Sequence, residues 1–297
     1  MRGWLCIFLF IAHSLVAQNF IVVHQGLKRN CLVHLPKNYH TSQKYPLIMS
    51  FHGWGGDPEQ QQQYTHMNSI ADREGFIIVY PQSYKQFWNT GLFSRSYWYG
   101  TDDVGFVRQL MDSLSEKFSV DQNRIYALGL SLGGFLVHRL ACELGDKVAA
   151  FASVSGLMSV KTRAACPTSG HAPFLQMHGT WDPSVWYIGT PEFLGAKGSV
   201  KFWRHFNGCE KADTVLLPDE CPQDRTKSEL IKWQCNEKSQ VWFVKIKHGG
   251  HAWPSGTINY WYFGRTSHDF NGGQLVWDFF KQFNLKDRNT QSAAHSP

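Results

Sequence analysis

The stretch that most constrains this chain is an apolar run, Ile125–Leu128, followed by Gly-Leu-Ser-Leu-Gly over residues 129–133. A helix-prone segment, Phe135–Leu144, comes next. In the order strand, tight turn and helix, the pattern G-x-S-x-G exposes a serine hydroxyl at the top of a sheet. The same pattern also occurs in buried turns without chemistry. We therefore interpret Ser131 as a candidate nucleophile that requires an acid and a histidine downstream and an oxyanion donor upstream.

Two later segments supply the acid and the histidine. Asp182 follows a buried-strand pattern in the run His-Gly-Thr-Trp-Asp-Pro, although Asp-Pro is also a common turn. His251 lies in a glycine-rich loop after another strand-like run, and His248 is its competitor nearer the end of that run. The order Ser, Asp, His is that of α/β-hydrolases and differs from the order in trypsin-like and subtilisin-like enzymes. The sequence therefore predicts a triad of Ser131, Asp182 and His251.

Each predicted residue has a chemical role. His251 would take the proton of Ser131 during attack, and Asp182 would fix the tautomer of the histidine. The oxyanion needs two N–H donors. We expect these from Leu132, directly after the nucleophile, and from Trp54 in a glycine-rich turn that ends an earlier apolar strand. Removing one such donor typically raises the barrier by about 3 kcal/mol.

Strand-like and helix-like segments alternate from Pro46 onward, without an internal repeat or a linker rich in Pro, Gly and Ser. This pattern predicts one α/β domain over residues 18–285, with a doubly wound, mostly parallel sheet and helices on both faces. Residues 60–73 are expected to form one helix, and the polar, cysteine-bearing residues 208–233 an excursion off the sheet. The polar tail 286–297 is expected to be disordered.

The first 17 residues have the pattern of a secretory signal peptide. Arg2 precedes an apolar run, Trp4–Ala12, and a small residue, Ala17, precedes the expected cut. The run is shorter than the ~20 residues of a membrane span. We expect a secreted or periplasmic protein without stable membrane insertion. Loss of Cys6 with the signal would leave an even set of cysteines, which predicts disulfides in an exported chain, with several pairings open.

The distribution of charge and the spacing of cysteine and histidine residues argue against two other functions, nucleic-acid binding and metal binding. The formal net charge is +6 with a sequence pI near 8.9, and the basic residues are spread along the chain. Without a block of basic residues, nucleic-acid binding has weak support. The chain contains no C-x-x-C or H-E-x-x-H spacing, so a structural or catalytic zinc site is not expected.

With these residues identified, the chain resembles the secreted polyhydroxybutyrate depolymerase and feruloyl esterase family, which includes family 1 carbohydrate esterases. The resemblance runs from about Arg29 to Phe280. It rests on ordered segments: His52–Gly56, Tyr99–Phe106, Gly129–Gly134, Val154–Gly156, His178–Pro183, Asn207–Cys209 and Gly249–Pro254. It implies an α/β-hydrolase fold, Ser131, Asp182 and His251 as the triad, and no metal or organic cofactor.

The resemblance also bears on the cysteines and the mouth of the site. It implies bridges Cys142–Cys166 and Cys209–Cys235, which leaves Cys31 and Cys221 to pair or to stay free. The chain departs from the family pattern at Leu132, where alanine is common, and around Trp181 and residues 184–187. These departures affect the expected substrate and leave the expected reaction unchanged.

Aromatic side chains are the candidate substrate contacts. Their rings are suited to stacking on a phenolic acid or a sugar, or to filling the core. The candidates are Trp88, Trp98, Trp181, Trp186 and Trp253. We expect a serine esterase that acts through an acyl-enzyme on feruloyl or acetyl esters of plant polysaccharide. The alternative is a polyhydroxyalkanoate depolymerase, which the lack of an appended binding module in the sequence disfavours. A catalytically inactive secreted binding protein is a third hypothesis, against which the intact triad residues argue.

Overall fold

The computed structural model describes residues 18–92, 100–235, 239–258 and 260–286. The predicted signal peptide, Trp98 and nearly all of the predicted tail lie outside the described residues.

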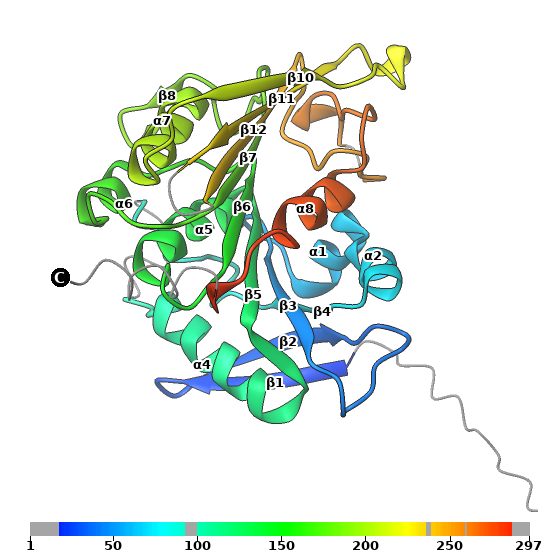
Figure 1. Ribbon diagram of the computed structural model, residues 1–297, viewed down its shortest axis with the longest axis vertical. Coiled ribbons are helices and arrows are strands. Elements are labelled where there is room, and N and C mark those ends of the chain that lie inside the picture. The colour runs from blue at the N-terminus through cyan, green and yellow to red at the C-terminus, as the bar shows by residue number, and fades with distance from the viewer. Residues whose placement is uncertain (1–17, 93–99, 236–238, 259, 287–297) are drawn as a thin grey trace, which may run out of the picture.

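A single large sheet runs through the described chain and positions everything else (Figure 1). In spatial order its strands are β1 (Gln18–His24), β2 (Leu27–His34), β4 (Ile77–Pro81), β3 (Tyr45–Phe51), β5 (Val120–Leu130), β6 (Ala150–Val154), β7 (Phe174–Gly179), β12 (Gln240–Lys247), β11 (Lys227–Gln234) and β10 (Ala212–Leu216). The strands from β4 to β12 pair in parallel, and antiparallel pairs extend both edges. The predicted doubly wound, mostly parallel sheet is confirmed.

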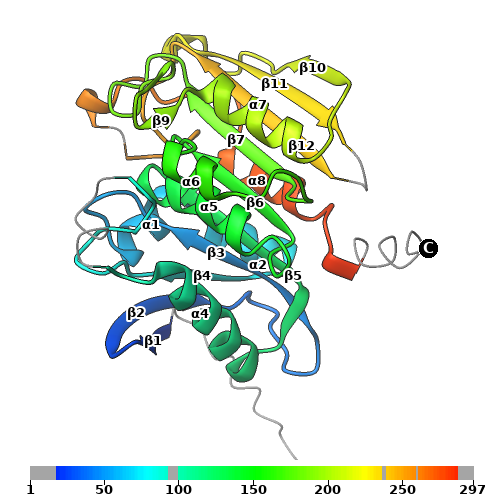
Figure 2. The same cartoon turned by 90° about the vertical axis from the view of Figure 1, so that its left-hand side faces the viewer.

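Helices cover both faces of the sheet (Figures 1 and 2). One face carries α4 (Asp103–Lys117), α5 (Leu132–Glu143), α6 (Val160–Ala165) and α7 (Ala196–Phe206). The other face carries α1 (Pro58–Thr65), α2 (Met67–Glu74) and α8 (Gly272–Phe280). Every residue of β3 and β7 is buried, as expected for apolar strands that are covered on both sides. Two short strands, β8 (Gly189–Thr190) and β9 (Phe193–Leu194), form a separate pair after β7.

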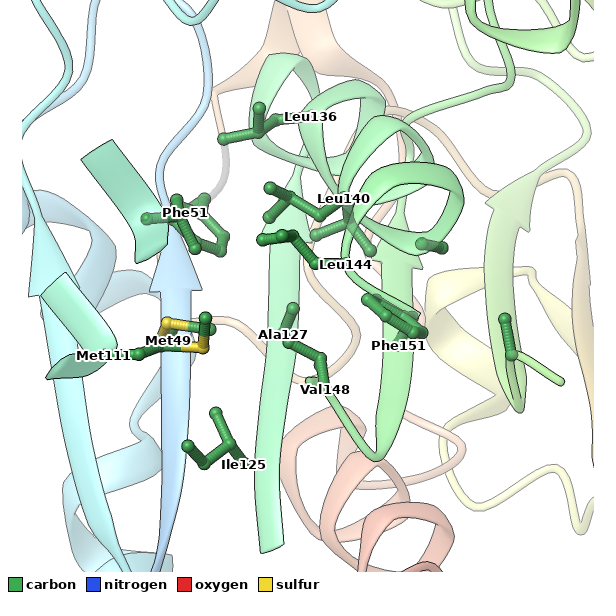
Figure 3. Packing of buried hydrophobic residues seen from close by; sticks show 14 of the residues in the cluster. Met49, Phe51, Met111, Ile125, Ala127, Leu136, Leu140, Leu144, Val148 and Phe151 are labelled. Carbon is green, nitrogen blue, oxygen red and sulfur yellow. The ribbon is translucent and has the colours of Figure 1, made fainter. Parts of the chain in front are cut away.

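The helix that follows the elbow packs firmly on the sheet. Leu136, Leu140 and Leu144 recur at a spacing of four residues, and all three are fully buried. Figure 3 shows them facing Ala127 of β5 and Phe151 of β6. Burial of one such leucine contributes about 1.5–3 kcal/mol, so α5 is anchored to the strands that flank it.

Within residues 208–233, residues 212–216 and 227–233 are strands of the sheet, so the expected excursion of the whole segment is wrong. β10 pairs with β11, and β11 pairs with β12. Every residue of β10 is exposed, so this edge strand lacks the buried face that reveals a strand in sequence. Backbone pairing with β11 holds it in the sheet.

The expected helix over residues 60–73 is divided into α1 and α2. His66 separates them in a left-handed conformation, with φ 52°. The imidazole Nε2 of His66 lies 2.9 Å from the hydroxyl of Thr257, and these two groups join the break to a distant loop. A residue in this conformation ends a helix, and the apolar periodicity across it did not reveal the break.

Both disulfides implied by the resemblance are confirmed. Cys142 bonds Cys166 and ties α5 to the end of α6, while Cys209 bonds Cys235 and ties the end of α7 to the end of β11. Cys31 and Cys221 are both free thiols. Cys31 is buried, and burial raises the pKa of its thiol to about 12, which keeps it protonated and unreactive.

None of the helices in the described ranges is long and apolar enough to cross a membrane.

A fully buried histidine joins three elements of the core. The indole Nε1 of Trp203 on α7 donates to Nδ1 of His138 on α5 at 2.9 Å. His138 therefore carries its proton on Nε2, which lies 3.2 Å from the side-chain oxygen of Gln176 on β7. Burial lowers the pKa of His138 to about 3, so the folded protein keeps this ring neutral.

We predict that His138 makes the fold acid-sensitive. Below about pH 6.5 the unfolded chain protonates this histidine, while the folded chain does not until about pH 3. Stability from this group is therefore complete above pH 6.5 and is lost as the pH falls. Between pH 7 and pH 5 the loss should be about 2 kcal/mol.

Urea unfolding of the wild type and of His138→Gln at both pH values measures this contribution. The variant can be less stable at every pH, but its stability should fall by about 2 kcal/mol less between pH 7 and pH 5. Equal pH dependence in the two proteins would contradict the assignment.

Candidate active site

The predicted site residues all follow the carboxyl ends of parallel strands. The chain leaves β3 toward β4 on one side, and later returns to place β5 on the other side of β3. Ligands of open α/β sheets bind at such a switch point. Ser131 follows β5, and the turn that contains Trp54 follows β3. Asp182 follows β7 and His251 follows β12, at the same edge of the sheet.

Backbone packing explains the glycines around Ser131. A Cβ added to Gly129 would lie 2.1 Å from the carbonyl oxygen of Gly133. A Cβ added to Gly133 would lie 2.2 Å from the carbonyl oxygen of Phe51 at the end of β3. Ser131 itself has φ 54° and ψ −119°, a strained conformation for a residue with a side chain. The pattern G-x-S-x-G thus has a structural cause at each of its fixed positions.

Asp182 and His251 are in direct contact. Nδ1 of His251 lies 2.8 Å from Oδ2 of Asp182, and the carboxylate is buried. An ionised carboxylate only accepts hydrogen bonds, so Nδ1 carries the proton and Nε2 keeps a free lone pair. His248, the competing histidine, is exposed, and its ring contacts Trp181 at a centroid distance of 4.4 Å. The geometry favours His251 over His248 as the partner of the acid.

The carboxylate of Asp182 is held by its own turn. Oδ1 accepts hydrogen bonds from the backbone N–H groups of Ser184 at 2.9 Å and Val185 at 2.7 Å. These bonds stabilise the ionised form and leave Oδ2 for His251. His178, buried beside the acid, lies 3.4 Å from Oδ2 and donates from Nε2 to the carbonyl of Val185 at 2.9 Å. Burial lowers the pKa of His178, so this ring is a neutral support.

The turn that contains Trp54 lies against Ser131. A Cβ added to Gly53 would lie 3.2 Å from Cβ and 3.7 Å from Oγ of Ser131. The turn is closed by a hydrogen bond from the N–H of Gly56 to the carbonyl of Gly53 at 3.2 Å. Leu132 is the first residue of α5, where backbone N–H groups have no partner within the helix. The two predicted oxyanion donors therefore belong to segments on either side of the serine hydroxyl.

A buried histidine holds this turn, and the sequence analysis assigned no role to it. The backbone N–H of Ser83 donates to Nε2 of His52 at 3.2 Å, so the proton resides on Nδ1, 2.7 Å from the carbonyl of Gly53. The indole N–H of Trp88 donates to the carbonyl of His52 at 2.9 Å. Burial lowers the pKa of His52 to about 4. The His-Gly pair at the end of β3 was the available signal for this role.

The candidate substrate contacts divide into exposed and buried rings. Trp88 and Trp253 are buried, at 0% and 2% exposure, so their prediction as stacking surfaces is wrong. Trp88 packs edge-on against Phe51 of β3 at a centroid distance of 5.4 Å, and Trp253 packs in the core cluster that includes Met67 and Val276. Trp54, Trp181 and Trp186 are exposed, at 72%, 59% and 56%. Trp98 lies outside the described residues.

An aromatic segment that the sequence analysis missed lies beside His251. Residues Tyr260, Trp261, Tyr262 and Phe263 form what we call the aromatic strip. The N–H of His251 donates to the carbonyl of Phe263 at 2.6 Å, and their rings lie 5.5 Å apart. The unbroken run of aromatic letters shortly after the histidine loop was the available signal.

The described part of the chain shows no group of three or more His, Cys, Asp and Glu side chains that is suited to a metal ion.

Comparison with known proteins identifies the family. Residues 32–170 match the family model of the esterase PHB depolymerases. A feruloyl esterase B from Thermothelomyces thermophilus is 31% identical over 222 residues, which cover 69% of this chain and 74% of the relative. The chain belongs to this esterase family. The resemblance expected from the sequence is confirmed.

Other relatives extend the match and confirm the fold. A bifunctional acetylxylan esterase/xylanase from Neocallimastix patriciarum is 29% identical over 88% of this chain, which spans only 34% of that relative's length. The solved feruloyl esterase module from Clostridium thermocellum superposes with a TM-score of 0.60 at 12% identity, over 90% of this chain and 87% of the module. The predicted α/β-hydrolase fold is thus confirmed, with β10 and β11 added at one edge.

We predict that Gly133→Ala disrupts the elbow. The new methyl group would overlap the carbonyl oxygen of Phe51, and backbone on both sides cannot yield without separating α5 from β3. Thermal or urea unfolding should show a loss of several kcal/mol.

Gly198→Ala on α7 is the matched control. A Cβ there would lie 3.3 Å from Cβ of Leu194 and would raise helix propensity, so its stability should change by no more than about 1 kcal/mol. Equal effects of the two substitutions would refute the steric explanation of the elbow.

Proposed function

We propose that this protein hydrolyses carboxylic esters by way of an acyl-enzyme, with Ser131 as the nucleophile. The single observation that carries the proposal is the bonded pair of Asp182 and His251 at the sheet edge that also carries the strained elbow of Ser131. A carboxylate, an imidazole and a serine in this chain order are the components of serine ester hydrolysis.

In the proposed reaction, Oγ of Ser131 attacks the carbonyl carbon of the ester while Nε2 of His251 takes the hydroxyl proton. The carbonyl oxygen becomes an oxyanion that accepts hydrogen bonds from the N–H groups of Leu132 and Trp54. The bond to the alcohol then breaks, and the alcohol leaves with the proton from His251. Water repeats the sequence on the acyl-enzyme and releases the acid and the free serine.

The charge states of the residues around Ser131 and His251 are consistent with this mechanism. Asp182 is acceptor-only and orients His251 with its lone pair on Nε2. The neighbouring His52 and His178 are kept neutral by burial, so they add no positive charge that would repel the imidazolium formed during the reaction. The only side chain in this set that needs to change its charge is His251.

The proposed substrates are feruloyl or acetyl esters of plant polysaccharide. The relatives whose names support this are a feruloyl esterase and an acetylxylan esterase. The exposed rings of Trp54, Trp181 and Trp186 supply apolar surface for an aromatic acid or a sugar. A polyester depolymerase is not favoured by these relatives, although the family model carries that name.

We further propose that the chain is exported. Its two disulfides are typical of proteins that fold in oxidising compartments, and its first residues have the composition of a signal peptide.

We predict that Ser131→Ala abolishes ester hydrolysis. Loss of the nucleophile should lower kcat for methyl ferulate and p-nitrophenyl acetate by at least about 10³-fold, as measured by release of the acid or the phenol. A serine-directed organophosphorus reagent should label the wild type once and the variant not at all.

Ser113→Ala on α4 is the matched control and should retain full activity. Hydrolysis that survives Ser131→Ala would refute the proposed nucleophile. Clearing of a polyhydroxybutyrate suspension without release of ferulate or acetate would replace the proposed substrate class with the polyester.

We predict that Asp182→Asn lowers kcat by about 10⁴-fold without unfolding the protein. The amide would present an N–H to Nδ1 and favour the tautomer with the proton on Nε2, which cannot accept the proton of Ser131. Asp213→Asn, on the exposed strand β10, makes the same change of charge away from the site and should have no effect. Full activity in Asp182→Asn would exclude Asp182 as the acid.

A further inference from the structure

The aromatic strip is a group of exposed aromatic side chains on the loop that follows His251. Trp261 is 89% exposed, and Tyr260 and Tyr262 are about half exposed. The rings of Tyr260 and Tyr262 stack at 5.4 Å with an interplanar angle of 13°. Exposure of aromatic rings to water is unfavourable, so a group of them on one loop indicates a surface that is covered in use.

The strip is rigidly joined to the loop that carries His251. The N–H of Gly250 donates to the carbonyl of Arg265 at 2.8 Å, beside the bond between His251 and Phe263. A Cβ added to Gly250 would lie 2.1 Å from the carbonyl oxygen of Phe263. The two segments are therefore in close backbone contact, and the strip has a fixed position relative to the histidine.

An open hollow of about 480 Å³ adjoins the same loop. Its lining includes Gln62, Gln63, His66 and Asn68 from α1, α2 and their junction, together with Thr257. In Figure 1 the loop after β12, coloured orange, lies between the upper end of the sheet and helices α1 and α8. The volume lies within the range of small-molecule sites.

Tyr64 connects the hollow to the strip. It lies on α1 between Gln63 and His66, and a Cβ added to Gly256 would lie 3.5 Å from its carbonyl oxygen. Burial raises the pKa of the Tyr64 hydroxyl, and the phenols of Tyr260 and Tyr262 raise it further. Tyr64 therefore packs against the loop that supplies Thr257 to the hollow and precedes the strip.

The chemistry of this surface selects its ligand. Aromatic faces stack on the C–H faces of sugar rings, and amide and hydroxyl side chains bond their hydroxyl groups. Within the described residues, the hollow is lined by no carboxylate, ammonium or guanidinium group. Among the described lining residues, only the imidazole of His66 can carry a positive charge, so an anionic ligand would gain at most one cationic partner. The amides of Gln62 and Gln63 instead offer donors and acceptors for hydroxyl groups.

The direction of proton transfer in the proposed reaction indicates that the sugar lies on the side of His251. In ester cleavage His251 returns its proton to the leaving alcohol, so the alcohol lies on the histidine side, while the carbonyl oxygen faces Leu132 and Trp54. Within the aromatic strip, Phe263 contacts His251 through its ring and its backbone carbonyl. Side chains of the strip therefore lie closer to the alcohol part of the ester than to its acyl part.

We propose that Trp261, Tyr262 and the adjoining hollow bind sugar residues of the alcohol part of the ester. The proposal rests on the proposed esterase function and identifies the part of the substrate that the enzyme recognises beyond the scissile bond. It predicts selectivity for esters on an oligosaccharide over the same acyl group on a simple alcohol.

The test compares matched pairs of substrates: feruloylated arabinoxylan oligosaccharide with methyl ferulate, and acetylated xylo-oligosaccharide with p-nitrophenyl acetate. Trp261→Ala should lower kcat/KM on the oligosaccharide by about fivefold, mainly through KM. Its kcat/KM on the simple ester should stay unchanged. Gln63→Ala should lower the oligosaccharide value by about threefold.

Two controls complete the design. Trp261→Phe keeps an aromatic face and should restore most of the selectivity. Leu216→Ala removes an exposed apolar side chain from the distant strand β10 and should change kcat/KM for neither substrate.

The outcomes separate the two proposals. An unchanged ratio of oligosaccharide to simple ester in Trp261→Ala overturns the sugar-binding role. An equal loss on both substrates also overturns it, because the strip would then serve His251 or the acyl group. A wild type that hydrolyses none of the four substrates refutes the esterase function itself, and the sugar site as an ester subsite with it.

Discussion

The close contact between the elbow and the end of β3 is the constraint on which the site depends. Gly133 touches the carbonyl of Phe51, and Gly129 faces the backbone of the helix that follows Ser131. This packing holds the serine in a strained conformation and brings the turn at Gly53 against it. The proposed nucleophile and the proposed oxyanion donors are therefore positioned by backbone, which varies less than side-chain rotamers do.

Around this contact the protein uses neutral, buried histidines as structural groups. His52 holds the proposed oxyanion turn, His178 supports the turn of Asp182, and His138 joins α5 to β7 and α7. Burial lowers the pKa of all three rings. In His52 and His138 the neutral imidazole donates one hydrogen bond and accepts another, so each ring links two backbone or side-chain groups without placing a charge near the proposed reaction.

The segments after the strands that carry the proposed triad also form the surface proposed for recognition. The loop after β12 supplies His251 and, a few residues later, the aromatic strip that contacts it. The break between α1 and α2 at His66 contributes to the same surface through Thr257. The sheet therefore fixes the reacting groups, while loops and an irregular helix junction form the surface proposed to meet the rest of the substrate.

The sequence alone determined the mostly parallel sheet, the chain order of Ser131, Asp182 and His251, and the expected turn at Trp54. It could do so because apolar periodicity and tight glycine turns are local properties. Only the tertiary structure decided that Asp182 binds His251 and not the exposed His248, that Trp88 and Trp253 are buried, and that β10 joins the sheet. These outcomes depend on contacts between residues far apart in the chain, where burial and pairing of backbone groups outweigh local preference.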